Sequence, residues 1–138
     1  MPAKKPRSKE KTKKRLSARQ RALLCADAAA DKKAEEPVIL GVSRLTSFAD
    51  YFVIVSGRST TQVKAIADSV EEAIYKSGSK PISIEGKTES KWILIDWNDV
   101  IVHIFHYQER QFYGLEKLWS DARYLRYPPA SRTTDNTT

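Results

Sequence analysis

The chain lacks long apolar runs and contains a single cysteine. Its longest apolar runs, 51–55 and 92–95, fall far short of the ~20 residues that a membrane-spanning helix needs. No apolar leader marks the N-terminus, and its lysine-rich composition is unlike that of a transit peptide. Cys25 alone forms no internal disulfide, which suits a reducing compartment. We therefore expect a soluble cytoplasmic protein that does not contact membranes.

The composition is that of one globular domain with tails. The 138 residues are 41% hydrophobic and 30% charged, which excludes wholesale disorder and leaves room for one core of ordinary size. Changes in composition along the chain predict three parts: a disordered basic extension over 1–16, a folded domain over 17–127 and a disordered polar tail over 128–138.

Positive charge is concentrated at the start of the chain. Ten lysines and arginines and one glutamate fall within residues 1–21, a local charge of +9 in a chain whose net charge is +7. The remaining residues are therefore mildly acidic, at −2. The block is either a solubilising extension or a tether to nucleic acid or a ribosome, because lysine and arginine bind phosphate backbones. For the tether, the expected contacts are Lys4, Lys5, Arg7, Lys9, Lys11, Lys13, Lys14 and Arg15.

Hydrophobic periodicity predicts a mixed α/β (α+β) domain with the element order α-β-β-α-β-β-β-α. The first helix, over 17–34, has a weak apolar stripe of Leu23, Ala26, Ala30 and Ala34. The second helix begins at a capping box of Ser59 and Gln62 and ends at Gly78. The expected strands are 38–42, 51–55, 81–85, 91–96 and 99–106, and the last helix is 108–120.

Two of these strands form a hairpin. If Trp97 and Asn98 are its two turn residues, Asp96 pairs with Asp99 and Trp92 lies opposite His103. One face is then wholly aliphatic and must be core. The other face collects residues that suit a protein–protein contact with an aromatic anchor and a charged rim, although a covering helix would make Trp92 plain core. Its members are Trp92, Leu94, Asp96, Asp99, Ile101, His103 and Phe105.

The segment after the hairpin adds a second aromatic group. Helical spacing predicts that Phe112, Leu115 and Trp119 or Leu118 pack inward, and that Tyr113 and Glu116 point outward. An outward tyrosine near an exposed tryptophan favours an interface.

The sequence gives little support for catalysis, and we expect no catalytic residue, metal site or cofactor. His103 and His106 point to opposite faces of one strand, so they cannot ligate a metal as a local pair. Asp96 and Asp99 are explained by the hairpin turn. The Ser56–Ser59 loop joins a strand to a capped helix but lacks the lysine and the glycines of phosphate-binding loops. Cys25 is expected to be a small packing residue.

Six collinear motifs resemble the signature of the ribosomal silencing factor, or Iojap-like, family over residues 19–124. They read LTSFADYFVIVSG (45–57), QVKAIAD (62–68), EG (85–86), WILID (92–96), DVIVHIF (99–105) and ERQFYGLEKLWSDA (109–122). Two departures from the family pattern stand out. The hairpin turn carries Trp97 and Asn98 where a glycine is common, and Gly114 replaces a frequent acid.

The resemblance implies a mixed, five-stranded sheet flanked by helices, related in shape to nucleotidyltransferases but without their catalysis. It implies a homodimer when free, and binding to the large ribosomal subunit through its ribosomal protein fourteen. There the factor blocks joining with the small subunit and represses translation under nutrient limitation. Trp92 and Tyr113 match family residues implicated in that contact.

We therefore expect a non-enzymatic binding protein. Its expected partner-binding residues are Trp92, Asp96, Asp99, His103, Tyr113 and Glu116, and its basic extension is expected to contact ribosomal RNA. Two alternatives remain open from the sequence: a nucleotidyltransferase-like enzyme that uses Ser56, Gly57 and a carboxylate pair, and an RNA-binding module that works through its tail and aromatic face.

Overall fold

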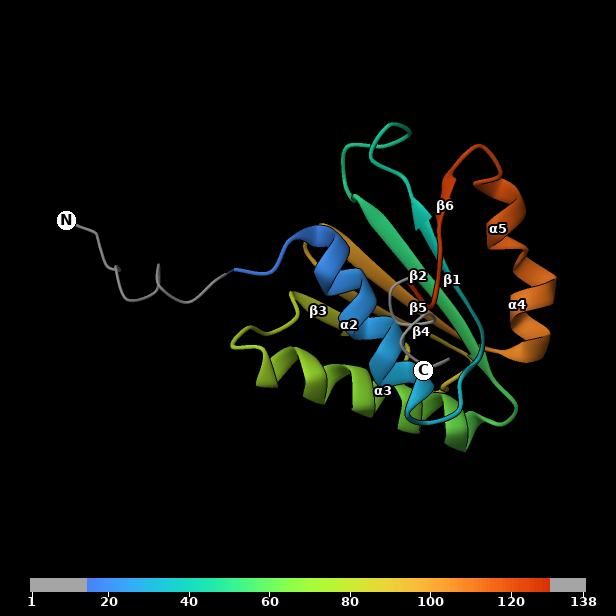
Figure 1. Ribbon diagram of the computed structural model, residues 1–138. Coiled ribbons are helices and arrows are strands. Elements are labelled where there is room, and N and C mark those ends of the chain that lie inside the picture. Colours follow the sequence, from blue (N-terminus) through green and yellow to red (C-terminus); the bar gives the residue numbers. More distant parts are fainter. Residues whose placement is uncertain (1–14, 130–138) are drawn as a thin grey trace, which may run out of the picture.

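The computed structural model describes residues 15–129, which fold into one layer of strands with helices against it (Figure 1). The seven basic residues expected as a tether before Arg15 lie outside the described residues, as does most of the expected C-terminal tail. In chain order the elements are α2 (Ala18–Ala30), β1 (Glu35–Gly41), β2 (Tyr51–Gly57), α3 (Thr60–Lys76), β3 (Ser83–Glu85), β4 (Trp92–Trp97), β5 (Val100–His106), α4 (Tyr107–Tyr113), α5 (Leu115–Leu118) and β6 (Arg123–Leu125).

The sheet is mixed and six-stranded, in the order β3-β4-β5-β2-β1-β6. Only β2 and β5 pair in parallel, and the other neighbours are antiparallel. The mixed α/β class is confirmed, but five strands were expected. The sixth, β6, is three residues long and pairs with the end of β1. Its short sequence, Arg-Tyr-Leu, has no alternation by which a strand could be recognised.

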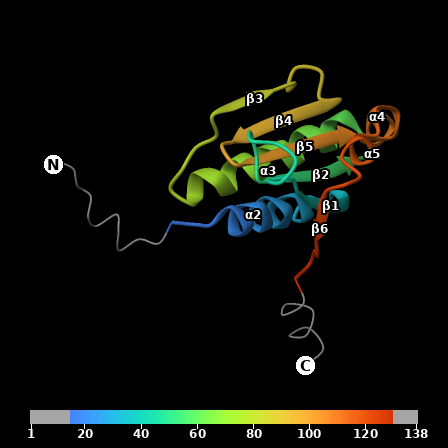
Figure 2. The same cartoon turned by 90° about the horizontal axis from the view of Figure 1, so that it is seen from above.

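Helices α2 and α3 lie side by side against one face of the sheet (Figures 1 and 2). Helix α2 ends at Ala30, not at residue 34, and starts with a capping box between Ser17 and Gln20. The predicted stripe is right in part: Ala26 is fully buried and Leu23 and Ala34 pack against the core, but Ala30 is exposed. The buried positions of α2 are small residues that allow close approach to α3. They are Ala22, Cys25, Ala26, Ala28 and Ala29.

Helix α3 is confirmed together with its N-cap. Ser59 Oγ accepts from the Gln62 N–H at 3.1 Å, but the Gln62 side chain accepts from Arg58 N–H at 2.7 Å, one residue before the cap. The apolar face packs on the sheet as expected, and Gly78 follows the helix at φ 93°. In the part of the chain that the structure describes, no helix combines the length and apolarity needed to cross a bilayer.

The hairpin forms, but its register differs by two residues from the prediction. Trp97 pairs with Val100, so the turn residues are Asn98 and Asp99, and Trp92 lies opposite Phe105 rather than His103. Because side chains alternate with a period of two, a two-residue slip leaves the side chains within the two strands on their predicted faces. Asp99 is the exception, because it now lies in the turn and pairs with Arg21 of α2. The aliphatic face (Ile93, Ile95, Val100, Val102 and Ile104) is fully buried beneath α2 and α3.

The predicted last helix is two short helices. Gly114 adopts φ 56° between α4 and α5, which turns the chain and changes the helical phase. As a result, Leu115 is buried as predicted, but Phe112 is 80% exposed, which contradicts its predicted inward position. Leu118, the alternative to Trp119, is also exposed, and Trp119 packs on the sheet.

Candidate functional site

An aromatic surface lies on the face of the sheet opposite α2 and α3. Its members come from β4, from the loop before β2, and from α4 and the end of α5. Helices α4 and α5 stand together at one end of the sheet (Figure 2) and leave much of β4 uncovered. Phe48, Phe112 and Tyr113 are 59%, 80% and 47% exposed, and Trp92, Leu94 and Trp119 are half-buried. We call these six residues the aromatic surface.

Trp92 is held from several sides. Its ring stacks on Phe105 with centroids 4.8 Å apart, and Tyr113 of α4 lies 4.8 Å away on a tilted plane. The indole Nε1–H donates to His103 Nδ1 at 3.2 Å. Aromatic pairs of this kind contribute about 0.5–1.5 kcal/mol each beyond area burial. Trp92 is therefore fixed in orientation and still partly open to solvent.

The ring contacts continue across the sheet to the loop before β2. Phe52 meets His103 at 5.0 Å and Trp119 at 4.9 Å, both edge to face. Phe48 lies 6.3 Å from Trp119 and 6.2 Å from Phe52. Residues distant in sequence thus form one connected aromatic layer with exposed members at both ends.

His103 lies beneath this surface rather than on it. The residue is 5% exposed, and burial lowers the pKa of its imidazole to about 4. Because Nδ1 accepts the Trp92 hydrogen bond, the neutral ring carries its hydrogen on Nε2. That Nε2 has no hydrogen-bond partner among the described residues. His103, which was expected to bind a partner, is thus buried and orients Trp92 through this hydrogen bond.

The three predicted carboxylates are not brought together. Asp96 is half-buried at the end of β4, where Oδ1 accepts from the Asn98 N–H at 3.0 Å. Asp99 lies in the hairpin turn and forms an ion pair with Arg21 of α2. Glu116 forms an ion pair with Arg110 at 2.9 Å. Only Asp96 accompanies Trp92 on the same face of β4 and is free of an ion pair in the described chain.

Arg110 is a structural residue that the sequence pattern did not predict. It is 7% exposed and donates to the carbonyls of Glu35 and Glu36 at 3.2 and 2.8 Å, and to Ser56 Oγ at 3.1 Å. With Glu116, these contacts fix α4 to β1 and β2. The available signal was an arginine two residues before the pair Phe112 and Tyr113 in a short helix. Its carbonyl acceptors, however, lie at a bulge in β1 where Glu36 has φ 47°, which the pattern could not predict.

The loop considered for phosphate binding is packed closely against side chains of α3. A Cβ at Gly57 would meet Gln62, Val63 and Ile66 at 3.3 Å, and the N–H groups of Arg58 and Gln62 are already bonded to side chains. Cys25 is fully buried in α2, and burial raises the pKa of its thiol to about 12, as befits a packing residue. Within residues 15–129, no three His, Cys, Asp or Glu side chains are placed to share a metal ion.

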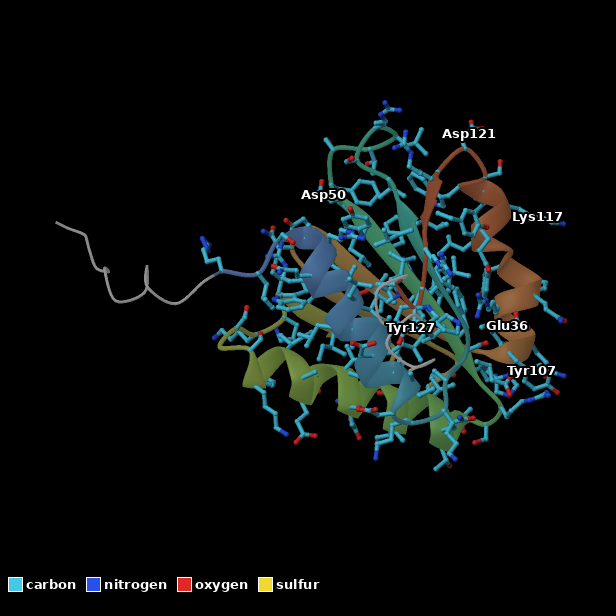
Figure 3. All side chains as sticks on the ribbon, in the orientation of Figure 1. Glu36, Asp50, Tyr107, Lys117, Asp121 and Tyr127 are labelled. Atoms are coloured by element: carbon cyan, nitrogen blue, oxygen red, sulfur yellow. The ribbon has the colours of Figure 1, made fainter. Side chains whose placement is uncertain are left out.

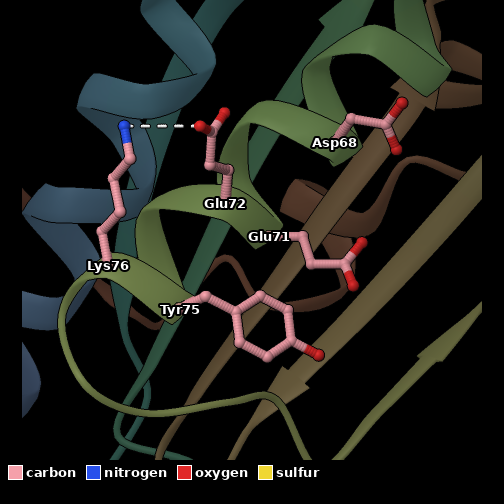
Figure 4. Close-up of a pocket in the computed structure, with 5 residues that line it drawn as sticks. All are labelled: Asp68, Glu71, Glu72, Tyr75 and Lys76. Carbon is pink, nitrogen blue, oxygen red and sulfur yellow. Dashed lines mark ion pairs between the residues drawn. The ribbon is translucent and has the colours of Figure 1, made fainter.

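The opposite side of the molecule carries a shallow acidic groove on α3 (Figure 4). Its carboxylates face nearby lysines: Lys87 lies 3.2 Å from Asp68 and 3.0 Å from Glu71. The pair of Glu72 and Lys76, drawn in Figure 4, is 3.3 Å apart. This side is therefore a solvated polar surface with its charges largely matched.

The chain is similar to known proteins over most of its length. The family model described as "Ribosomal silencing factor during starvation" matches residues 15–138. A protein named ribosomal silencing factor RsfS from Halalkalibacterium halodurans is 43% identical over 99 residues, which are 72% of this chain and 85% of that protein. One of the same name from Bacillus subtilis is also 43% identical over 99 residues, covering 72% and 84% of the two chains.

Solved structures show the same fold. A crystal structure of a protein from Chromobacterium violaceum superposes with a TM-score of 0.75 at 31% identity. The superposition covers 76% of this chain and 88% of that one. The likeness therefore extends over nearly the whole described domain.

Proposed function

The chain belongs to the ribosomal silencing factor family, and on that premise we propose that it binds the large ribosomal subunit and blocks its association with the small subunit. Translation would then be repressed when nutrients are limiting. The mechanism is occlusion rather than catalysis, because a protein that covers a joining surface needs only to bind there. The setting we propose is the cytoplasm, and the free state is a homodimer.

The observation that supports this proposal is the aromatic surface. Protein interfaces are enriched in tryptophan and tyrosine, and a few such residues carry most of the binding free energy. Trp92 and Tyr113 are in ring contact, partly exposed, and held in place from below by Phe105 and His103. We propose that both rings contact the ribosomal protein numbered fourteen of the large subunit.

The carboxylates have different roles in this proposal. Asp96 accepts hydrogen bonds from a basic partner, because it lies on the Trp92 side of β4 without an ion pair in the described chain. Asp99 and Glu116 act through the ion pairs that fix the hairpin turn and α4. Ribosomal proteins are basic, so the Asp96 carboxylate beside the aromatic surface also favours encounter with such a partner.

The experiment is co-sedimentation with purified large and small subunits, followed by a subunit-joining assay. Tyr113→Ala and Trp92→Ala should each lower affinity for the large subunit by at least about tenfold, which corresponds to ~1.4 kcal/mol, and should permit joining. The matched control is Tyr75→Ala on α3: Tyr75 is 52% exposed, against 47% for Tyr113, but lies on the opposite side of the molecule. Equal binding of all variants would contradict the proposal.

The same assay tests the basic extension. We propose that Lys4, Lys5, Arg7, Lys9, Lys11, Lys13, Lys14 and Arg15 contact ribosomal RNA. Removing residues 1–14 keeps Leu16, whose side chain packs against the core. The truncated chain should bind the large subunit more weakly and with a shallower salt dependence, because fewer counterions are released. An unchanged affinity and an unchanged salt dependence would contradict this role.

A further inference from the structure

A second basic feature lies within the folded domain, at the end of the sheet where β1 ends and β2 begins. A hollow of about 480 Å³ is lined by Arg19 of α2, Arg44 of the loop after β1, and Arg123 of β6. All three arginines are exposed, and none forms an ion pair with a described residue. Three separate elements thus bring unpaired guanidinium groups to one concavity.

The strand pairing explains why the hollow is open. Gly41, the last residue of β1, pairs with Tyr51 on one side and with Arg123 on the other. With no side chain at Gly41, the space between these neighbours stays empty; a Cβ there would lie 3.4 Å from the Arg123 carbonyl oxygen and 3.7 Å from the Tyr51 ring.

The lining combines charge with ring faces. Tyr51 and Tyr124 both contribute to it, and Tyr124 is 59% exposed. One carboxylate, Asp50, also lines the hollow and is seen in Figure 3 near the start of β2, so the net charge of the lining is still positive. Guanidinium groups bind phosphate oxygens and tyrosine rings stack on unpaired bases, the combination that single-stranded RNA requires.

We propose that this hollow binds a phosphate and an adjoining unpaired nucleotide of RNA. The inference rests on the proposed function, because the large subunit supplies RNA next to its proteins. The loop that carries Arg44 also carries Phe48 of the aromatic surface. At a ribosomal site where protein and RNA adjoin, both features can therefore bind at once. The aromatic surface would contact the ribosomal protein, and the hollow would contact the RNA.

The test uses the full-length ¹⁵N-labelled chain titrated with an oligouridylate, and follows backbone amide resonances. Shifts are expected at residues 17–19, 43–44 and 123–125. The variant Arg44→Gln/Arg123→Gln should lose these shifts. For the RNA binding that remains, the slope of log K against log [salt] should be shallower than that of the wild type by about 0.7, since one single-strand phosphate contact contributes ~0.7. The control Lys64→Gln/Lys117→Gln changes the charge equally at exposed positions outside the hollow and should behave as wild type.

Three outcomes would overturn the inference: no shifts around the hollow, equal weakening by both double variants, or the same shifts with polyglutamate, which would make the site one for acidic peptides.

The proposed function can fail separately. If the wild type does not bind the large subunit while oligouridylate still shifts the hollow residues, the RNA site stands without the ribosomal assignment. If Tyr113→Ala abolishes large-subunit binding while the hollow residues do not respond to RNA, only the RNA site fails.

Discussion

Trp92 and His103 act as a unit at the scale of single residues. The indole hydrogen bond to Nδ1 requires a neutral imidazole, because a protonated ring has no acceptor. Burial lowers the pKa of His103 to about 4 and so keeps this acceptor available at neutral pH. Protonation of His103 would both charge a buried ring and break its bond to Trp92.

A pH dependence of stability follows from this burial. An unfolded histidine binds its proton near pH 6.5, whereas folded His103 does so only at about 4. The contribution of His103 to the free energy of unfolding is therefore fully present above pH 6.5. It is lost as the pH falls toward 4, with a slope of up to ~1.4 kcal/mol per pH unit. In urea unfolding, the free energy of unfolding of the wild type minus that of His103→Gln should fall by about 3 kcal/mol from pH 7 to pH 4.

The control for this prediction is His106→Gln, which leaves His103 and its bond to Trp92 in place. In that variant, the free energy of unfolding should fall with decreasing pH by the same His103 contribution as in the wild type. A wild-type imidazole signal of His103 that titrates near pH 6.5, or a constant difference between wild type and His103→Gln, would contradict the assignment.

The sequence identifies exposed anchors better than buried positioning residues. Trp92 and Tyr113 were predicted as candidates for a contact surface because strand alternation and helical spacing both leave them outward. Arg110 was not, because its value depends on two carbonyls that a strand bulge presents from far along the chain. The Asp99 pairing with Arg21 likewise depends on how α2 crosses the hairpin turn.

At the scale of elements, strand β4 depends on the tight turn that precedes it. Gly86 has φ 92°, and a Cβ there would lie 2.1 Å from the carbonyl oxygen of Trp92. Only glycine combines this backbone conformation with so close an approach. The first residue of β4 is therefore positioned by backbone contact as well as by its ring neighbours.

Two glycine substitutions should separate the cost of a steric clash from the cost of a positive φ. Gly86→Ala should destabilise the fold by about 3 kcal/mol or more, because backbone strain and a clash with Trp92 combine. Gly78 has φ 93° but open space around its Cβ position, so Gly78→Ala should cost only about 1 kcal/mol. Urea unfolding measures both, and equal costs would show that the close approach at Gly86 is relieved by movement.

Element types were predictable, while ends and short pieces were not. Helix α3 was predicted correctly because its apolar face is regular, and β2 and β5 because each is a nearly continuous apolar run. The hairpin turn was placed at Trp97 and Asn98, one residue early, because Asn98 tolerates positive φ at either turn position. The break at Gly114 and the strand β6 depend on packing against β1 and β2, which local patterns do not contain.

At the scale of the whole molecule, the sheet has one face buried under α2 and α3 and one partly exposed aromatic face, the proposed binding face. The residues of β4 alternate between them: Ile93 and Ile95 are fully buried under the helices, and Trp92 and Leu94 are half-buried on the other side. Neighbouring positions of one strand thus belong in turn to the core and to the proposed binding surface.

Neighbouring alanine substitutions should separate the two properties. Ile95→Ala removes fully buried apolar contacts and should lower the free energy of unfolding by about 2–5 kcal/mol. Leu94→Ala should cost about 1 kcal/mol of stability, since the side chain is only half-buried, yet weaken large-subunit binding several-fold. Urea unfolding and co-sedimentation on the same preparations check both; loss of binding by neither variant would assign the interface to another face.

The Arg110 contacts have a consequence for the kinetics of association. By joining α4 to β1, β2 and Glu116, they hold the Tyr113 side of the surface in one arrangement before any partner arrives. A preorganised surface loses little conformational entropy on binding. If this surface binds the large subunit as proposed, weakening the Arg110 contacts would lower the association rate, because α4 would have to reach its bound position first. The side chains proposed to touch the partner would be unchanged.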